Sequence, residues 1–593
     1  MIRRPLRPLA RILRARAAGT DPGVIETAER RARAEMVRDR ARLRAEGRLL
    51  LLAGAFVLAF GTVGGRMAVL AASEPEEPRA AATGSPIVGQ RADITDRNGR
   101  VLATNFETHA LYAQPRQMVD PARAARELVA IFPELDADRL LRDFTGSRTF
   151  LWVRRTISPE QMQAVHDIGE PGLLFGPRDM RLYPNGAIAA HILGGASYGR
   201  EGVDAAEVIG EAGVERFMDA ALRDPANAGA PVALSIDLTV QAAMEDVLAG
   251  GMALLNARGA AAIIMDVHTG EIMAMASLPD FDPNNRPAVL TTGDQSDSPL
   301  FNRALQGVYE LGSVFKIFPI AQALELGLVN PQTMIDTRGP MTWGRFRIND
   351  FRNYGPELSI TDVIVKSSNI GTVRVALQIG PTRQRAFLGS LGFLVPTQVE
   401  MIEAPTGAPL LPREWSEIAQ MTISYGHGLS TSPLHLAAGY ASIVNGGTLI
   451  RPTLLRQDGP QDGPRVISET VSAQMRDMLR QVVSRGTASF ADIAGYDVGG
   501  KTGTADKPRP TGGYYDDRVI ATFAGMFPAS DPAYVIIVTL DEPVETSGSE
   551  PRRTAGWTAV PVAAEIIRRT APLMGLRPMI EPAPMDGITL TSN

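Results

Sequence analysis

Two residue types are scarce in this sequence. Among its 593 residues there is no cysteine, and only four of the 60 basic residues are lysine. Without cysteine the chain can form neither disulfides nor thiolate metal sites, so its cysteine content says nothing about the redox state of its compartment. The scarcity of lysine says more, because arginine serves equally well on a solvated surface but cannot lose its proton near neutral pH and act as a base. The positions that remain lysine are therefore candidates for chemistry; they are Lys316, Lys366, Lys501 and Lys507.

Motifs for metals and nucleotides are also missing. The six histidines show neither H-E-x-x-H nor another paired spacing, which indicates scattered structural histidines and predicts no metal site. No G-x-x-x-x-G-K-[ST] phosphate loop is present. The net charge of −5 gives no overall signal for nucleic acid. We therefore predict no metal, no cofactor and no nucleic-acid partner.

Three short motifs contain or adjoin lysines: S-x-x-K at Ser313–Lys316, S-x-N at Ser367–Asn369, and K-T-G-T at Lys501–Thr504. If Ser313 opens a helix, Lys316 lies one turn further on the same face, where its amine can reach the serine hydroxyl. An amine in a partly dry pocket loses proton affinity and becomes a usable base near neutral pH. The first motif thus predicts a serine nucleophile with its own base.

The other two motifs complete an acyl-transfer site. In the turn expected between two helices within residues 359–376, Ser367 could relay a proton to the leaving group while the Asn369 amide holds the substrate peptide. Gly503 would let the substrate backbone approach a sheet edge, and the N–H groups of Thr504 and Ser313 could form an oxyanion hole. Each motif alone is common, but the three in this order are not expected by chance. The predicted catalytic residues are Ser313, Lys316, Ser367, Asn369 and Lys501, and the predicted substrate-binding residues are Thr502, Gly503 and Thr504.

The three motifs together resemble the set found in penicillin-binding proteins and serine β-lactamases. Over roughly residues 49–575 the chain resembles the class B penicillin-binding proteins, and within them those of the division septum. Val314 stands where the family often has threonine and Ala92 where it often has glycine, and neither touches a catalytic group. The other matching segments are Arg91–Gly99, Arg181–Pro184, His191–Gly194, Gly210–Phe217, Tyr309–Gly312, Ser424–Gly428 and Ser432–Leu434.

The resemblance implies a peptidoglycan D,D-transpeptidase that cross-links stem peptides through a serine acyl-enzyme and that β-lactams inhibit. It also implies a glycosyltransferase partner of the FtsW type and other division proteins. A β-lactamase or β-lactam sensor, an inactive division scaffold and an elongation-specific transpeptidase are the alternatives. A lactamase would need neither a pedestal nor an anchor, and a scaffold would tolerate loss of Lys316. Asn369 favours division, because elongation relatives often carry aspartate there.

The N-terminus has the charge pattern of a membrane anchor. Residues 1–48 hold 14 arginines against six acidic residues and run into residues 49–65, which are uncharged and mainly apolar. A span needs about 20 residues, and the apolar stretch continues to residue 72 beyond Arg66, which can extend to the interface. We expect a single-pass inner-membrane protein with a cytoplasmic N-terminus and a periplasmic catalytic domain. A cleaved signal peptide is the alternative, but the charged lead and the apolar core are both long for one.

The remaining pattern predicts an α+β fold in which an antiparallel sheet lies between helical layers. A hairpin is expected at residues 260–277, with further strands at 519–527 and 534–540 and a closing helix at 559–569. The expected organisation is an arginine-rich tail (1–48), an anchor (49–72), a linker (73–87), a pedestal of the dimerisation type (88–230), a transpeptidase domain (231–575) and a C-terminal tail (576–593).

Overall fold

The computed structural model describes residues 7–72, 91–203, 206–227, 229–344, 346–509 and 511–579. The chain forms two compact units, Met1–Arg79 and Ala80–Asn593. The expected linker at 73–87 and most of the expected C-terminal tail lie outside the described residues.

The first unit consists of two helices, α1 (Arg7–Ala17) and α2 (Pro22–Ala72). Within the part of the chain that the structure describes, no helix combines the length and the apolar character needed to cross a membrane. The expected anchor lies in α2, and the side chains of its residues 49–51 and 66–72 lie outside the described part.

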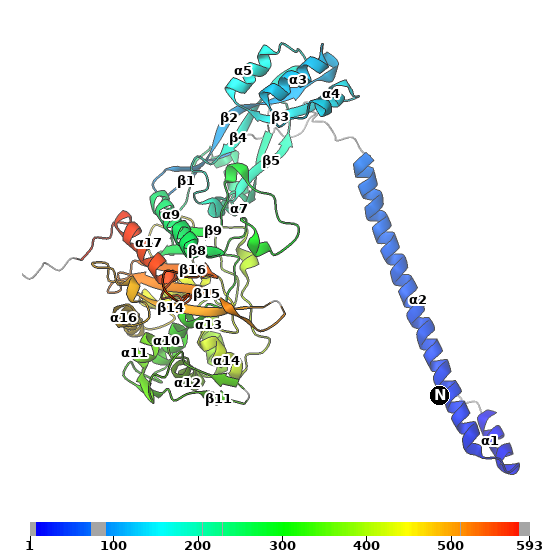
Figure 1. Cartoon of the computed structure of the whole chain (residues 1–593), viewed down its shortest axis with the longest axis vertical. Coiled ribbons are helices and arrows are strands. Elements are labelled where there is room, and N and C mark those ends of the chain that lie inside the picture. The colour runs from blue at the N-terminus through cyan, green and yellow to red at the C-terminus, as the bar shows by residue number, and fades with distance from the viewer. Residues whose placement is uncertain are drawn as a thin grey trace, which may run out of the picture. The chain divides into compact units, whose positions relative to one another are not determined.

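The second unit begins with a sheet around the long strand β2, which pairs antiparallel with β1, β3 and β4. Three helices pack beside this sheet, and Leu111, Leu128 and Phe132 are among the buried residues of the resulting core (Figure 1). Strand β7 pairs parallel with β1, so residues just after the expected boundary at 230 complete the first sheet. The elements are β1 (Ile94–Thr95), β2 (Val101–Ala113), α3 (Pro121–Ile131), α4 (Ala137–Thr145), β3 (Leu151–Ile157), α5 (Pro159–Asp167), β4 (Leu173–Leu182), α6 (Ala190–Leu193), β5 (Gly195–Glu201), β6 (Ala206–Ala212), α7 (Gly213–Phe217), α8 (Asp219–Leu222) and β7 (Val232–Ala233).

A buried ionic cluster joins three of the segments that resemble the family. The fully buried Glu215 carboxylate lies 2.7 Å from the Arg91 guanidinium and 2.6 Å from the Arg181 guanidinium. Arg91 also lies 2.7 Å from Asp219, and the Tyr183 hydroxyl donates to Glu215 at 3.3 Å. Because a buried charge without an opposite charge is costly, these contacts favour the arrangement in which the three segments meet.

The catalytic part is built on a five-stranded antiparallel sheet in the order β14-β15-β16-β8-β9. Its strands are β8 (Gly259–Asp266), β9 (Ile272–Leu278), β14 (Gly499–Pro508), β15 (Tyr514–Phe527) and β16 (Tyr534–Asp541). All seven residues of β9 are buried, and because successive side chains point to opposite faces, both faces of the sheet must be covered. The hairpin and the two later strands expected from the sequence are confirmed.

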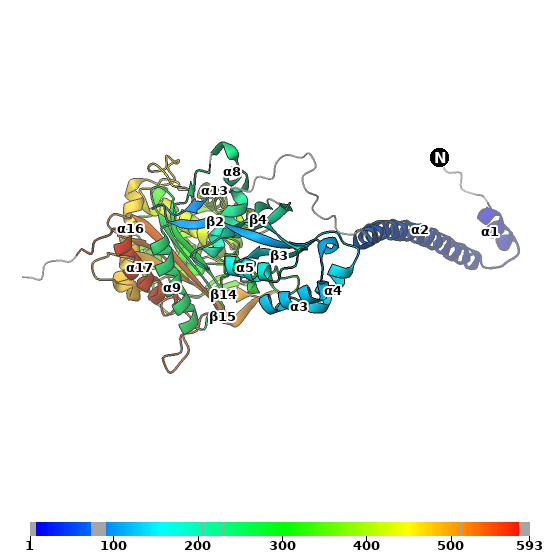
Figure 2. The ribbon, with the colours of Figure 1, turned by 90° about the horizontal axis from the view of Figure 1, so that it is seen from above.

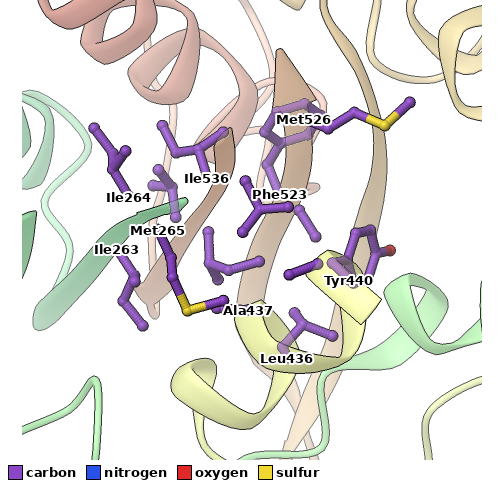
Figure 3. Packing of buried hydrophobic residues seen from close by; sticks show 14 of the residues in the cluster. Ile263, Ile264, Met265, Leu436, Ala437, Tyr440, Phe523, Met526 and Ile536 are labelled. Carbon is purple, nitrogen blue, oxygen red and sulfur yellow. The ribbon is translucent and has the colours of Figure 1, made fainter. Parts of the chain in front are cut away.

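Helices cover the two faces. Helices α9 (Leu238–Leu254) and α17 (Ala559–Leu573) pack on each other and on one face, and α15 (Pro433–Val444) and α16 (Glu469–Arg485) pack against the sheet on the other (Figures 1 and 2). Leu436, Ala437 and Tyr440 of α15 lie on the side of the sheet to which Ile263 and Met265 point, and Ile264 and Ile536 point to the other side (Figure 3). The expected sheet between helical layers and the closing helix are therefore confirmed.

A helical region beside β14 carries Ser313, the predicted nucleophile. The turn η5 (Gly312–Lys316) is a 3₁₀ helix that continues as α10 (Ile317–Glu325). Pro319 is the third residue of α10, so its missing N–H is one that has no partner within an α-helix, and the proline costs the helix no hydrogen bond. The remaining elements here are β10 (Met334–Asp336), β11 (Met341–Trp343), β12 (Phe346–Ile348), β13 (Glu357–Ser359), α11 (Ile360–Val365), α12 (Asn369–Ile379), α13 (Pro381–Ser390) and α14 (Glu417–Ser424).

Candidate active site

Ser313 lies on η5, partly exposed, between the buried residues Gly312 and Val314. A 3₁₀ helix has three residues per turn, so Lys316 lies directly one turn below Ser313, which is tighter than the α-helical geometry expected. The turn is held from both sides. The buried Tyr440 hydroxyl donates to the Val314 carbonyl at 2.8 Å, and the Gly312 N–H donates to the Gly426 carbonyl at 3.1 Å.

Two lysines from distant motifs meet at one serine. Lys316 Nζ lies 2.5 Å from the Ser367 carbonyl oxygen and 3.0 Å from Ser367 Oγ. Lys501 Nζ lies 2.9 Å from the same Oγ and 3.0 Å from the Thr502 carbonyl. Among the described residues the Lys316 amine makes its hydrogen bonds to Ser367 and none to Ser313, so the direct contact expected with the nucleophile is absent in this state.

Burial makes both amines weak bases. Lys316 and Lys501 are both 0% exposed. Burial holds the pKa of Lys316 well below the usual lysine range; the nearby charge of Lys501 lowers it further, and Asp350 opposes the shift. Burial also lowers the pKa of Lys501 to about 7. Burial deprives the charged forms of hydration, and the charge of Lys501 further disfavours a charge on Lys316.

Ser367 reaches both amines because its backbone takes an unusual conformation. Its φ is +62°, in the left-handed region that non-glycine residues seldom adopt. Next to it, Ser368 caps α12 by accepting the Gly371 N–H at 2.9 Å and donates to the Asp350 carboxylate at 2.7 Å. Asp350 also accepts the Ile370 N–H at 3.0 Å. The expected turn between two helices, α11 and α12, is thus confirmed. Asp350 stabilises it through its hydrogen bonds with Ser368 and Ile370.

Asn369 stands at the first position of α12 and donates from its side-chain amide to the Asn349 carbonyl at 2.9 Å. The amide is therefore positioned by the segment after β12. That this amide binds the substrate peptide remains a prediction.

Strand β14 runs at the edge of the sheet, against the nucleophile turn. A Cβ on Gly503 would lie 2.3 Å from the Leu311 carbonyl oxygen, and a Cβ on Gly312 would lie 2.7 Å from the Thr504 carbonyl oxygen. Glycine at both positions lets the two backbones touch, so the absent side chain of Gly503 makes room for the nucleophile turn. This proximity is compatible with an oxyanion hole between the Ser313 and Thr504 N–H groups, which remains a prediction.

The side chains of the two threonines in this motif have protein partners. Thr502 and Thr487 share a hydroxyl–hydroxyl hydrogen bond of 2.7 Å. The Thr504 hydroxyl accepts the Ala555 N–H at 3.0 Å. Any contact of the two threonines with substrate is therefore expected mainly through the backbone of the edge strand.

The structure separates the four lysines into two pairs. Lys366, although next to the S-x-N motif, lies partly exposed 3.9 Å from Asp362 and takes no part in the site. Lys507 forms ion pairs of 2.7 Å with Asp541 and 2.8 Å with Glu542. The inference that every remaining lysine is a candidate for chemistry is therefore wrong for these two. No group of three or more metal-ligating side chains occurs within the described residues.

Four functional candidates escaped the sequence analysis. Asp350 and Tyr440 have no local signal, because their tasks depend on segments far away in the chain. Glu310 and His427 lie in segments that resemble the family, and this resemblance was the only signal for them. Glu310 accepts the Gly428 N–H at 2.6 Å and the Tyr514 hydroxyl at 2.9 Å, which ties the nucleophile turn to the rim of the site.

Comparisons with known proteins identify the family. Residues 260–568 match the family described as penicillin binding protein transpeptidase domain, and residues 86–227 match the penicillin-binding protein dimerisation domain. The chain therefore belongs to the penicillin-binding transpeptidases, in the class B architecture that joins these two domains.

Within the class, the relatives include the FtsI proteins. The chain is 36% identical over 503 residues to the probable peptidoglycan D,D-transpeptidase FtsI of Caulobacter vibrioides, covering 83% of this chain and 82% of the relative. It is 28% identical to peptidoglycan D,D-transpeptidase FtsI of Escherichia coli, covering 84% and 87%. The crystal structure of penicillin-binding protein 3 from Mycobacterium tuberculosis complexed with ampicillin superposes with a TM-score of 0.63 at 26% identity, covering 84% of this chain and 98% of that one.

Proposed function

We propose that this protein is a septal peptidoglycan D,D-transpeptidase that uses Ser313 as its nucleophile. The observation that carries the proposal is the convergence of two fully buried lysines on Ser367 Oγ, at 3.0 and 2.9 Å, beside the turn that presents Ser313. Such an arrangement supplies a neutral amine and a retained proton within one hydrogen-bonded chain. General-base activation of a serine requires the first, and protonation of a leaving amine requires the second.

The first stage is acylation. Lys316 accepts the Ser313 hydroxyl proton as Oγ attacks the penultimate D-alanine carbonyl of a stem peptide, directly or through Ser367. The proton then passes through Ser367 to the nitrogen of the terminal D-alanine, which leaves as the peptide bond breaks. Lys501 keeps its proton and donates a hydrogen bond to Ser367. Its positive charge disfavours a second positive charge on Lys316 and so keeps that amine neutral. The N–H groups of Ser313 and Thr504 are the proposed donors to the oxyanion.

The second stage transfers the acyl group. An amine of a neighbouring stem peptide attacks the ester carbonyl, a carbon–nitrogen bond forms, and the bond to Ser313 Oγ breaks. A β-lactam would enter at the first stage and form a corresponding ester. Peptidoglycan stem peptides are therefore the proposed substrates and β-lactams the proposed inhibitors.

A labelled penicillin tests the nucleophile. The full-length protein should take up one label, and mass spectrometry of the proteolytic peptides should place it on Ser313. Ser313→Ala should remain unlabelled, whereas Ser489→Ala, at a serine outside the three motifs, should label normally. A label on another serine would overturn the assignment.

We also propose that residues 49–72 anchor the protein in the inner membrane and that it acts with an FtsW-type glycosyltransferase and other division proteins. Support comes from the uncharged stretch at 49–65 and from exposed apolar side chains along it, among them Val57 (73%), Leu58 (74%) and Phe60 (71%). The relatives named FtsI favour division over elongation. Depletion in the source bacterium should give filaments; round cells would indicate elongation.

A further inference from the structure

A histidine lies beside the nucleophile turn and has no task in the scheme above. The hydrogen bond between Gly312 and Gly426 joins the residues that directly precede Ser313 and His427. A Cβ on Gly426 would lie 2.0 Å from the Gly312 carbonyl oxygen, so no side chain separates the two segments. His427 is therefore carried by the loop that packs directly on the nucleophile turn.

The imidazole has an unsatisfied nitrogen. Nδ1 of His427 is buried and has no hydrogen-bond partner among the described residues. The Tyr425 carbonyl lies near enough to raise the pKa of the ring, yet it does not meet hydrogen-bond geometry at Nδ1. Buried polar atoms without partners are rare in native proteins, and next to a reaction centre a substrate group is an obvious candidate to supply the missing contact.

The groups around His427 favour a cation. Its ring lies 5.2 Å from the Tyr425 ring and 6.2 Å from the Tyr514 ring, measured between centroids. Glu310 and Asp506 raise the pKa of His427 and Lys316 lowers it, but burial is the largest effect and holds the pKa below its usual value of 6.5. At neutral pH the ring is thus uncharged and lies near two carboxylates, so an ammonium group is attracted and a proton acceptor is available.

The proton balance of the transfer stage gives such a group a task. An acceptor that arrives as an ammonium loses two protons when it becomes an amide N–H. One proton returns to Ser313 Oγ when the ester bond breaks, which the Lys316–Ser367 pair can accomplish. The other must leave the amine before it attacks, and Lys316 cannot hold both.

We propose that Glu310 and His427 form the site for the acceptor amine, and that His427 Nδ1 takes the first proton from it. The resulting free amine attacks the Ser313 ester, the carbon–nitrogen bond forms as the carbon–oxygen bond breaks, and the imidazolium releases its proton to solvent. The substrate class is a primary ammonium on a second stem peptide. This inference rests on the proposed function, because it assigns the second substrate of that reaction.

The test measures what happens to the acyl-enzyme. Full-length protein is supplied with a thioester donor that acylates the serine and with a stem tripeptide that carries a free side-chain amine, and cross-linked and hydrolysed products are separated by chromatography. Their ratio is counted only on molecules that were acylated and therefore folded. The same tripeptide with its amine acetylated is the substrate control.

His427→Asn places an amide near the position of Nδ1 that can accept a hydrogen bond but not a proton. The ratio of cross-linked to hydrolysed product should fall by about 10² or more, through the rate of transfer and not through the apparent KM for the acceptor. His427→Ala should impair both the rate of transfer and the apparent KM, and Glu310→Gln should raise the KM.

In the parent the ratio of cross-linked to hydrolysed product should fall as the pH drops below 6.5 through the pKa of the imidazole, and His427→Asn should lose this dependence. His268→Gln, at an exposed histidine of the same domain, should match the parent.

The outcomes distinguish failure of the proposed transpeptidase function from failure of the proposed acceptor site. If the parent forms no cross-linked product with any acceptor, the proposed transpeptidase function fails. If the parent transfers and both His427→Asn and His427→Ala keep its ratio at every acceptor concentration and pH, only the acceptor site is overturned. A fall in the ratio with an unchanged pH profile would also overturn proton uptake by His427.

Discussion

The amino groups of Lys316 and Lys501 approach the same atom, Ser367 Oγ, at 3.0 and 2.9 Å. Both amines are buried, so the pair loses its protons in two coupled steps rather than as two independent lysines. In the proposed mechanism the first loss produces the base that activates Ser313. The second removes the charge that keeps that base neutral and that supports proton delivery through Ser367.

Replacing Lys316 by arginine should retain the positive charge and remove the proton acceptor. The second-order rate of acylation by a labelled penicillin should fall by about 10² to 10⁴, the usual contribution of general-base catalysis. Lys366→Arg is the matched control, because Lys366 neighbours the S-x-N motif and lies 3.9 Å from Asp362 on the surface. A rate for Lys316→Arg within a few fold of the parent would remove this residue from the role of base.

The pH dependence of acylation should follow the protonation states of Lys316 and Lys501. Lys316 must be neutral to act, so activity is lost as the pH falls through its depressed pKa. Lys501 must be protonated, so kcat/KM should decline as the pH rises through about 7, the pKa to which burial lowers it. In Lys501→Arg the guanidinium stays charged, and the alkaline decline should disappear from whatever activity remains. The same decline in both proteins would show that another group causes it.

Gly426→Ala should disable the site from a position outside the three motifs. Gly426 has a φ of +86°, and its added Cβ would lie 2.0 Å from the Gly312 carbonyl oxygen, so the nucleophile turn must move. Gly327→Ala is the control, since Gly327 has a φ of +66° with open space around it and should lose only about 1–2 kcal/mol from backbone strain. Thermal unfolding should rank Gly426→Ala as the less stable, and penicillin labelling should fall only in that variant.

Glu215→Ala should destabilise the pedestal, because it leaves the Arg91 and Arg181 guanidinium groups buried without their shared carboxylate. Breaking a buried ion pair typically costs about 3–5 kcal/mol, which denaturant unfolding should detect. Glu565→Ala removes a carboxylate from a largely exposed group of ion pairs with Arg568 and Arg569 and should change stability little. Equal effects of the two substitutions would contradict the importance assigned to the buried cluster.

Removing residues 1–72 should leave penicillin binding intact and abolish function at the septum. The three motifs lie within residues 313–504, so the truncated protein should fold and bind penicillin. Exported by an unrelated signal sequence, it should nevertheless fail to support septation, because an anchored enzyme meets membrane-bound partners at a high effective concentration. Normal division at native expression level would show that the anchor is dispensable and would count against the partner hypothesis.

The sequence by itself determined the local elements of the catalytic part and most of its site. The hairpin at 260–277 and the strands after residue 514 follow from apolar runs and turn residues, and the order of the motifs predicted which serines and lysines belong together. These features depend on neighbours within a few residues, and such neighbours are visible in a sequence. Of the buried cluster around Glu215, the sequence showed only separate segments that resemble the family. It did not indicate that these segments meet.

Tertiary structure alone decided which lysines come together and which groups surround them. Lys366 is adjacent to Ser367 in the chain but lies partly exposed beside Asp362, whereas Lys501, 134 residues away, reaches the Ser367 hydroxyl. Asp350 and His427 acquire their surroundings in the same way, from segments that meet only in the folded chain. The physical reason is that burial is the main cause of the lowered pKa values of Lys316 and Lys501, and no single segment can bury an amine on all sides. Packing of η5, α12 and β14 against one another is what buries the two amines and lowers their pKa values.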